Sequence, residues 1–469
     1  MRRLALPLLP LLLCAGCALG PNYQRPKVDV TQTFRDQAQA EAASLADQPW
    51  WDVFGDDTLK ALIDDSLKHN FEVRIAAQRV EEYRARAGIE KSDWFPTIAA
   101  QAQWERGRQS VYTPGGGTTG SIFDVHAALS WELDLWGKVR RLNEAALANY
   151  LGAREARRGV HLATVAQVAQ AYFELRELDH RLEVTQATVA AFQETLDLFG
   201  RRLAGGAASA LETARAEASL ASAAATIPTL ERQIQAQENL LSFLVGRNPG
   251  PINRGRDLTA QPLPPLIPAG LPSDLLERRP DVRVAEQRLV AANAAVGVAT
   301  ANYFPTLSLT GFLGGLAPHV AQLFNEGKGW IVSPVLAAPV FQGFKLKYQK
   351  QAAIAQWEQA RIQYEGTVNA AFGEVSTALV AYGKLAQAEQ EQARAVAALQ
   401  EATRLATLRY TAGLSSYLEV LDAQQQLFPA QNALSQARLA RLLTLVQFYK
   451  ALGGGWNLED PTRSPKKAS

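Results

Sequence analysis

The sequence predicts a mainly α-helical protein with a smaller β part that crosses a membrane, built from one unit that occurs twice. Three observations support this prediction. Two halves of the chain align with each other, long proline-free stretches repeat apolar residues at helical spacing, and short segments alternate between apolar and polar residues.

The repeat is visible in two separate alignments. Residues 70–97 align without a gap with residues 279–306, so that Phe95 corresponds to Phe304 at an offset of 209. Residues 203–220 align with 410–427, with Gly206 against Gly413, at an offset of 207. A nearly constant offset indicates a tandem duplication rather than chance similarity between alanine-rich helices. The chain is therefore divided into a first repeat at 58–246, a Pro-rich linker at 247–272, a second repeat at 273–453 and a tail at 454–469.

The first 16 residues have the features of an export signal, a basic start and a leucine-rich run too short to span a membrane as a helix. Cys17 follows Ala-Gly, which resembles a bacterial lipidation signal, and is predicted to be the lipid-bearing first residue of the mature chain. Cys17 is also the first residue of a predicted N-terminal strap at 17–57. Cys14, the only other cysteine, would leave with the signal, so no disulfide is expected. The alternative is a plain signal peptide with an incidental cysteine at position 17.

Each repeat is expected to hold one very long helix and two shorter ones. No proline occurs between Gly137 and Leu203, and apolar residues recur there at heptad spacing, which is typical of helices wound around neighbours. At about 1.5 Å per residue this helix would be roughly 100 Å long. Such thin elements cannot bury their apolar faces alone, so further copies of the chain should complete the core. The expected helices are 58–94, 137–202 and 210–245, then 274–302, 344–409 and 417–452.

Each repeat also carries a predicted pair of strands. Between Ile122 and Trp136 apolar residues alternate with polar ones, as in strands with one face toward lipid and the other toward water. A soluble sheet packed on the helices would alternate similarly, and the strand pattern alone leaves that alternative open. Four strands cannot close a barrel, and a sheet in lipid needs closed edges, so the sheet should be shared between chains. The expected strands are about 97–112 and 119–136, then about 306–317 and 329–342.

The composition argues against nucleic-acid binding, metal binding and catalysis. The net charge is +2 with 20% charged residues, which indicates no basic surface for nucleic acid. The five histidines are scattered and Met1 is the only methionine, so no thiol, thioether or paired-histidine metal site is expected. Common nucleotide-binding, hydrolase and metalloprotease motifs do not occur, and the glycine run at 115–117 lies between strands. No enzyme activity and no cofactor are expected, apart from covalent lipid on Cys17.

Several segments resemble the outer membrane factor family, in its TolC-related lipoprotein branch, and the resemblance runs from Cys17 to about Asn457. The segments are CALGPNYQRP, QPWWDVFGDDTLKALIDDSL, WELDLWGKVR, LLERRPDVRVAEQRLVAANAAVGVATANYFPTLSLTGFLGG and FYKALGGGWN. The resemblance implies a homotrimer in the outer membrane, with four strands per chain in a shared twelve-stranded β-barrel and an α-helical barrel in the periplasm. It implies the passive exit duct of a tripartite efflux pump. Its partners would be a periplasmic adaptor protein and an inner-membrane resistance-nodulation-division pump.

The resemblance also implies roles for residues near the ends of the long helices. It places the periplasmic tip at the turns with Gly206 and Gly413, and the narrowest constriction at Leu418 and Asp422, four positions apart on one helix face. By the repeat offset of 207 their equivalents are Leu211 and Arg215. Asp422 and Arg215 could then alternate around one ring and hold the duct shut. The alternative is that Asp422 only stabilises the positive end of its helix.

Two other functions stay open on the sequence. Type I secretion systems use related ducts, so the exported cargo could be a polypeptide. A lipid-anchored periplasmic coiled-coil scaffold would share the heptads and the acylated cysteine, although it does not account for the alternating strands. The exported substrate and the particular pump and adaptor are not indicated by any residue pattern.

Overall fold

The structure is a computed structural model that describes residues 18–29, 33–34, 44–47, 53–108, 117–206, 208–264, 268–270 and 272–454. The predicted signal peptide, Cys17 and the tail beyond Gly454 lie outside the described residues. The chain divides into two compact units, one from Met1–Lys27, Arg79–Arg154 and Val284–Glu365, the other from Val28–Gln78, Glu155–Arg283 and Gly366–Ser469. Each unit contains parts of both repeats. The predicted class, mainly α with four antiparallel strands, is confirmed.

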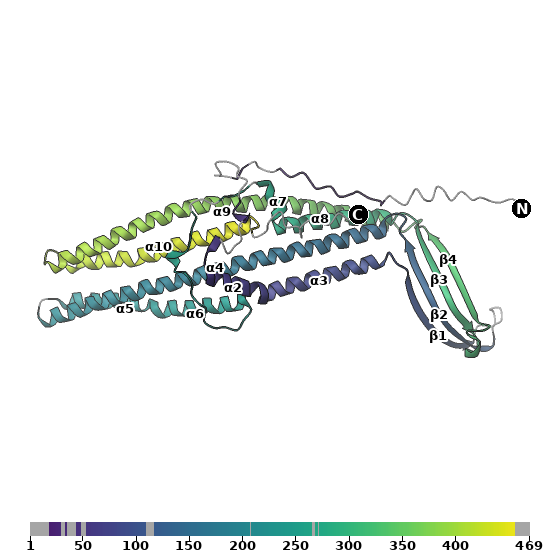
Figure 1. Ribbon diagram of the computed structural model, residues 1–469, viewed down its shortest axis with the longest axis horizontal. Coiled ribbons are helices and arrows are strands. Elements are labelled where there is room, and N and C mark those ends of the chain that lie inside the picture. The colour runs from purple at the N-terminus through teal and green to yellow at the C-terminus, as the bar shows by residue number, and fades with distance from the viewer. Residues whose placement is uncertain are drawn as a thin grey trace. The chain divides into compact units, whose positions relative to one another are not determined.

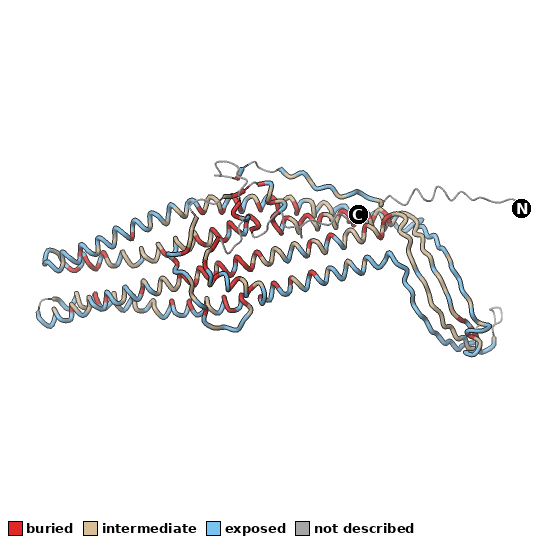
Figure 2. The backbone as a smooth tube through the Cα atoms, in the orientation of Figure 1, coloured by how far each residue is buried: buried red, intermediate tan, exposed pale blue. Residues whose placement is uncertain are grey.

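The first unit contains one antiparallel sheet in the order β1-β2-β3-β4 (Figure 1). Its strands are Thr97–Arg108, Thr119–Leu133, Thr306–Ala317 and Lys328–Ala337. The central strands β2 and β3 come from different repeats, so the sheet joins the two copies. Within the described residues, β1 and β4 each pair along one edge only. Most strand residues are exposed or partly buried in the single chain (Figure 2).

The two faces of the sheet differ in polarity. Trp104 pairs with Phe123 on one face, whereas Gln103 pairs with Asp124 on the other. On that second face Nδ1 of His126 lies 2.7 Å from Oδ1 of Asp124. The alternation along β2 therefore gathers the polar side chains of β1 and β2 on one face, where β3 and β4 instead carry Phe312 and Ile331.

Two strands end earlier than predicted. β2 stops at Leu133 rather than at residue 136, because the Asp134 carboxylate accepts hydrogen bonds from the N–H groups of Val139 and Arg140, at 2.9 and 3.2 Å. This is a capping role, and it starts the next helix. β4 stops at Ala337 rather than at 342, and Pro339, which cannot donate to a sheet, follows two residues later. The predicted end of β1 at residue 112 lies outside the described residues.

The two longest helices and the last one agree with the prediction. α4 (Lys138–Ala204) and α9 (Lys345–Thr411) each contain 67 residues, and their first residues are related by the repeat offset of 207. α10 (Tyr417–Ala451) continues through Pro429. Among the described residues, no helix has both the length and the apolarity needed to cross a membrane.

Three helices predicted as continuous are each divided in two. Residues 58–94 form α2 (Asp57–His69) and α3 (Phe71–Ser92), because Asn70 leaves the helical conformation and its Oδ1 caps α3. Residues 274–302 form α7 (Leu275–Arg278) and α8 (Pro280–Ala301), because a residue before proline disfavours the helical conformation and Arg279 is extended. Residues 210–245 form α5 (Ala210–Ala224) and α6 (Thr226–Val245), because Pro228 cannot donate to the preceding turn.

An N-terminal segment, residues 18–27, belongs to the first unit and forms neither helix nor strand. The N–H of Leu19 donates to the carbonyl of Trp136 at 3.0 Å, and the buried guanidinium of Arg141 donates to the carbonyl of Leu19 at 3.2 Å. Arg25 makes two hydrogen bonds of 2.7 Å to Glu286. The segment thereby connects α4 of the first repeat to α8 of the second.

The buried carboxylate of Asp56, directly before α2, organises the second unit. Burial by itself raises the pKa of Asp56, but hydrogen bonds from Gln261 and from backbone N–H groups outweigh it and hold the pKa below its usual value. Because its donors come from α2, α4 and the linker, the carboxylate holds these three segments together. The hydrogen-bond donors to the Asp56 carboxylate are the N–H groups of Thr58, Leu59 and Arg256, the Tyr172 hydroxyl and the Gln261 amide.

We predict that Asp56→Ala lowers the midpoint of thermal unfolding, followed by circular dichroism, well below that of Asp57→Ala, which removes an exposed carboxylate beside it. Each buried donor left without a partner costs about 1–3 kcal/mol. Because the pKa of Asp56 is lowered by folding, its stabilisation is present above the unfolded pKa and lost as pH falls through the folded pKa. The difference between the two variants should therefore shrink below about pH 4. Equal midpoints at pH 7 would contradict this role.

Candidate functional site: the turns and groove at the ends of the long helices

Each long helix ends in a turn that contains a left-handed glycine. After α4 ends at Ala204, Gly206 has a φ of +73°, and after α9 ends at Thr411, Gly413 has a φ of +72°. Side chains disfavour this backbone conformation, which is why glycine is common directly after a helix. Nothing lies within 4 Å of the place that a Cβ would take at either glycine. Backbone conformation, not close packing, therefore requires glycine here.

The helices that leave these turns start differently. Ser209 and Glu212 form a capping box at α5, in which each side chain accepts a hydrogen bond from the other residue's N–H, at 3.2 and 2.8 Å. Ser416 precedes α10 without a side-chain capping bond. An ion pair of 3.4 Å between Arg409 and Glu419 spans this second turn instead.

An aromatic cluster joins the two hairpins within one chain. The ring of Tyr417, at the start of α10, lies 4.3 Å from that of Phe199 on α4 and 5.7 Å from that of Tyr410 on α9, centroid to centroid. Arg202 lies over the Tyr410 ring at 4.8 Å and donates to its hydroxyl. Burial raises the pKa of Tyr417 to about 12, so this hydroxyl stays neutral. Ala216, on α5, completes the buried cluster.

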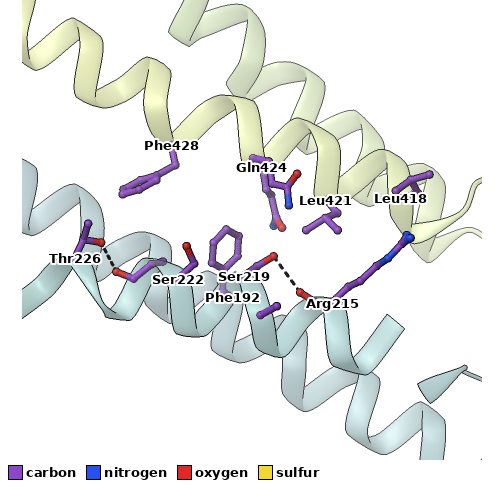
Figure 3. A pocket seen from close by; sticks show the side chains of 12 residues that line it. Phe192, Arg215, Ser219, Ser222, Thr226, Leu418, Leu421, Gln424 and Phe428 are labelled. Carbon is purple, nitrogen blue, oxygen red and sulfur yellow. Dashed lines mark hydrogen bonds between the residues drawn. The ribbon is translucent and has the colours of Figure 1, made fainter. Parts of the chain in front are cut away.

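A groove of about 670 Å³ lies next to this cluster, between α5 and α10 (Figure 3). Arg215 extends from α5 toward Leu418 on α10, and the rings of Phe192 and Phe428 line the groove farther along. A second cavity of about 390 Å³, between α4 and α10, shares Phe192 and Phe428 with it. The two hairpins of one chain are therefore in close contact at the cluster but leave open space beyond it.

The structure brings two of the four predicted gate residues together. Leu418 and Arg215 line the same groove, whereas Leu211 is 60% exposed on α5 outside it. Asp422 is exposed and accepts a hydrogen bond of 2.8 Å from Gln426 on its own helix. Within the described residues of one chain, Asp422 and Arg215 form no ion pair. Their pairing between neighbouring chains stays a prediction.

Sequence reasoning missed the cluster of Arg202, Tyr410 and Tyr417. Tyr410 and Tyr417 are separated by seven positions around Gly413, but this spacing alone does not indicate that both rings pack against Phe199 of α4. Elsewhere, no group of three His, Cys, Asp or Glu side chains among the described residues could hold a metal ion. The predicted lipid site, Cys17, lies outside the described residues.

Comparison with known proteins gives the family. The family model described as outer membrane efflux protein matches residues 62–247 and 271–454. The probable efflux pump outer membrane protein TtgC of Pseudomonas putida is 37% identical over 454 residues, which cover 95% of this chain and 94% of TtgC. The chain belongs to the outer membrane efflux protein family, as the sequence resemblance predicted.

Solved structures agree with this assignment. The open state of the outer membrane channel MtrE of Neisseria gonorrhoeae superposes with a TM-score of 0.85 at 34% identity, over 94% of this chain and 98% of MtrE. The outer-membrane channel OprN superposes with a TM-score of 0.87 at 30% identity, over 94% of this chain and all of OprN. The chain therefore has the fold of an outer membrane efflux channel.

We predict opposite effects of alanine at two glycines of α9 and its turn. Gly413→Ala places a side chain on a left-handed backbone and should destabilise the turn by about 1 kcal/mol. Gly383→Ala, in the helix interior with nothing near its Cβ, should stabilise the helix by about 0.5–1 kcal/mol. Hydrogen–deuterium exchange of amides near residue 413 should become faster in the first variant only. Unchanged exchange there would show that the turn does not need glycine.

Proposed function

We propose that three copies of the chain assemble around one axis into the outer membrane exit duct of a tripartite efflux pump. The sheet is the observation that supports this most directly. It has four strands, one apolar face, a second face that is polar along β1 and β2, and an unpaired edge on both β1 and β4 within the described residues. A sheet in lipid must pair its edges, and three copies would supply a closed ring of twelve strands with the apolar face outside.

The proposed partners follow from the family. An outer membrane component of an efflux pump needs a pump that supplies it with substrate. The resemblance of this chain to the outer membrane factor family favours an inner-membrane pump of the resistance-nodulation-division type. A periplasmic adaptor would join the two at the turns with Gly206 and Gly413. The duct itself would conduct passively, and the class of substrate would be set by the pump.

The proposed gate is a pair of rings at the tip. Leu418 and Asp422 are both exposed in the single chain and lie one helical turn apart on α10. In a trimer they would form one ring of leucines and one of carboxylates, with Leu211 and Arg215 on the alternate helices. Exposed ion pairs contribute about 0.2–1 kcal/mol each, so a ring of Asp422–Arg215 pairs could close the duct and still yield to a docked adaptor.

The gate is tested by single-channel conductance in planar bilayers. Replacing Leu418 and Asp422 together by alanine should raise the conductance without changing trimer yield. Leu414→Ala, which removes another exposed leucine, from the turn itself, is the matched control and should leave the conductance unchanged. A variant in which the two charges are exchanged, Asp422→Arg with Arg215→Asp, should keep the low conductance of the parental protein. Parental conductance in the Leu418→Ala, Asp422→Ala variant would place the constriction elsewhere.

The lipid would attach next to the sheet. Ala18, which follows Cys17, lies against Gly137 between β2 and α4, where a Cβ on the glycine would come within 2.5 Å of the Ala18 Cα. An acyl chain on Cys17 would therefore enter the membrane close to where β2 ends. Its anchoring would add to that of the strands, because stable attachment by acyl chains alone needs more than one of them or a second contact.

Cys17→Ser should abolish incorporation of labelled palmitate while leaving trimers in the outer membrane fraction. The matched control is Cys14→Ser, which lies in the predicted signal and should change neither. A Cys17→Ser protein that is monomeric and released to the periplasm would contradict the proposed membrane sheet and favour a scaffold held by lipid alone.

A further inference from the structure

The segment that connects β3 to β4 folds back over the apolar face of the sheet. Trp104 and Phe123 are on this face, and Gly315 is on it too, because its partner Val125 is two residues from Phe123. A Cβ on Gly315 would collide with the carbonyl of Leu323 in the connecting segment, and Leu323 is only 3% exposed. The connecting segment is therefore fixed on the face at a position where only glycine fits.

An apolar groove of about 340 Å³ lies on this face beside the connecting segment. Phe324 of the connecting segment lines the groove and is 66% exposed. Three alanines and two larger apolar residues of the strands line it with side chains on this face, namely Ala100, Ala102, Val125, Ala127 and Leu313. The groove crosses β1, β2 and β3, so strand pairing at the outer edges of β1 and β4 would leave it open.

Basic side chains follow the groove toward the hairpin ends of the strands. By the alternation along the strands, Arg106 of β1 and Lys328 of β4 are on the apolar face, and both are exposed. Neither forms an ion pair with a described residue. The described strand residues of this face include no carboxylate, and Glu326 of the connecting segment accepts a hydrogen bond of 3.1 Å from Gln322. The end of this face is therefore positively charged.

We propose that each chain binds a phosphorylated glycolipid of the outer leaflet, with an acyl chain in the groove and phosphates at Arg106 and Lys328. The proposal rests on the membrane sheet of the proposed function. The helices join the opposite ends of the strands, so the hairpin ends would point away from the periplasm (Figure 1). The outer leaflet of an outer membrane consists mainly of glycolipids that carry phosphates and several acyl chains.

The distances along and across the strands agree with this occupant. Arg106 lies four residues beyond Ala102, which is about 14 Å along β1. One leaflet contributes half of the ~30 Å hydrocarbon core, so a lipid held at the surface by Arg106 would reach the groove with its acyl chain. Arg106 and Lys328 are at least three strand spacings apart, about 14 Å, so two phosphates fit them better than one.

Binding of purified diphosphoryl lipid A to the full-length protein in detergent, measured by native mass spectrometry, tests the site. We expect saturation at one lipid for each chain. Arg106→Gln with Lys328→Gln should raise the dissociation constant about tenfold or more, because charge-assisted contacts are lost. Lys91→Gln with Lys345→Gln is the matched control, since it removes two exposed cations that precede β1 and follow β4 at the other ends of these strands.

A second set of variants tests the groove. Ala102→Phe places a ring in the groove and should weaken binding by a similar factor. Ala99→Phe introduces the same ring on the opposite face of β1 and should leave binding unchanged. Phe324→Ala, at an exposed position, covers the case in which Ala102→Phe does not fold, and it should weaken binding several-fold.

The outcomes separate this site from the duct itself. Saturable binding that both sets of variants weaken relative to their controls supports the proposal. Equally tight binding of monophosphoryl lipid A or of phosphatidylglycerol would overturn the assignment to a doubly phosphorylated glycolipid. If the protein is a trimer in the outer membrane fraction and no variant weakens binding, the site is wrong and the duct stands. If the protein is a monomer outside the membrane, both proposals are wrong.

Discussion

Every backbone N–H and C=O along a sheet edge needs a hydrogen-bond partner where lipid replaces water, and the rest of this molecule depends on that requirement. β2 and β3 meet it inside the chain by pairing across the two repeats, whereas among the described residues the outer edges of β1 and β4 have no partner. The same division extends into the helices. α4 and α8 contact each other within the chain, as at Arg141 and Gly297, whereas no described atom lies within 4 Å of a Cβ position at Gly88 of α3, the repeat equivalent of Gly297.

Features encoded locally could be predicted from the sequence. The heptads and missing prolines of α4 and α9 predict helices that the structure reproduces to within about two residues, the usual uncertainty of helix ends. Gly206 and Gly413 indicate left-handed turns because few other residues tolerate that backbone. The helix breaks before Pro280 and near Pro228 also have a local signal in the sequence, because proline restricts the backbone of its neighbours. The helical periodicity on both sides of each proline nevertheless predicts one continuous helix.

Features that depend on contacts between distant segments could not be predicted in this way. Asn70 divides α2 from α3, and its side-chain amide donates a hydrogen bond of 2.8 Å to the carbonyl of Leu244. No sequence pattern near residue 70 indicates that Leu244 is its partner. The direction of Arg215 is a similar case: the repeat offset relates it to Asp422, but a side chain of this length can reach along the groove, and within one chain it points to Leu418.

The relative strength of the contacts at the tip indicates which of them should give way first. Phe199, Tyr410 and Tyr417 hold the two hairpins of a protomer together, and fully burying an aromatic side chain stabilises by about 1.5–3 kcal/mol, with about 0.5–1.5 kcal/mol more for a ring pair. An exposed ion pair between Asp422 and a neighbour's Arg215 would contribute about 0.2–1 kcal/mol. Separating the hairpins of one protomer would therefore cost more than breaking such an ion pair between protomers. We expect the tip to open by movement of whole hairpin pairs against each other, with the aromatic cluster intact in each.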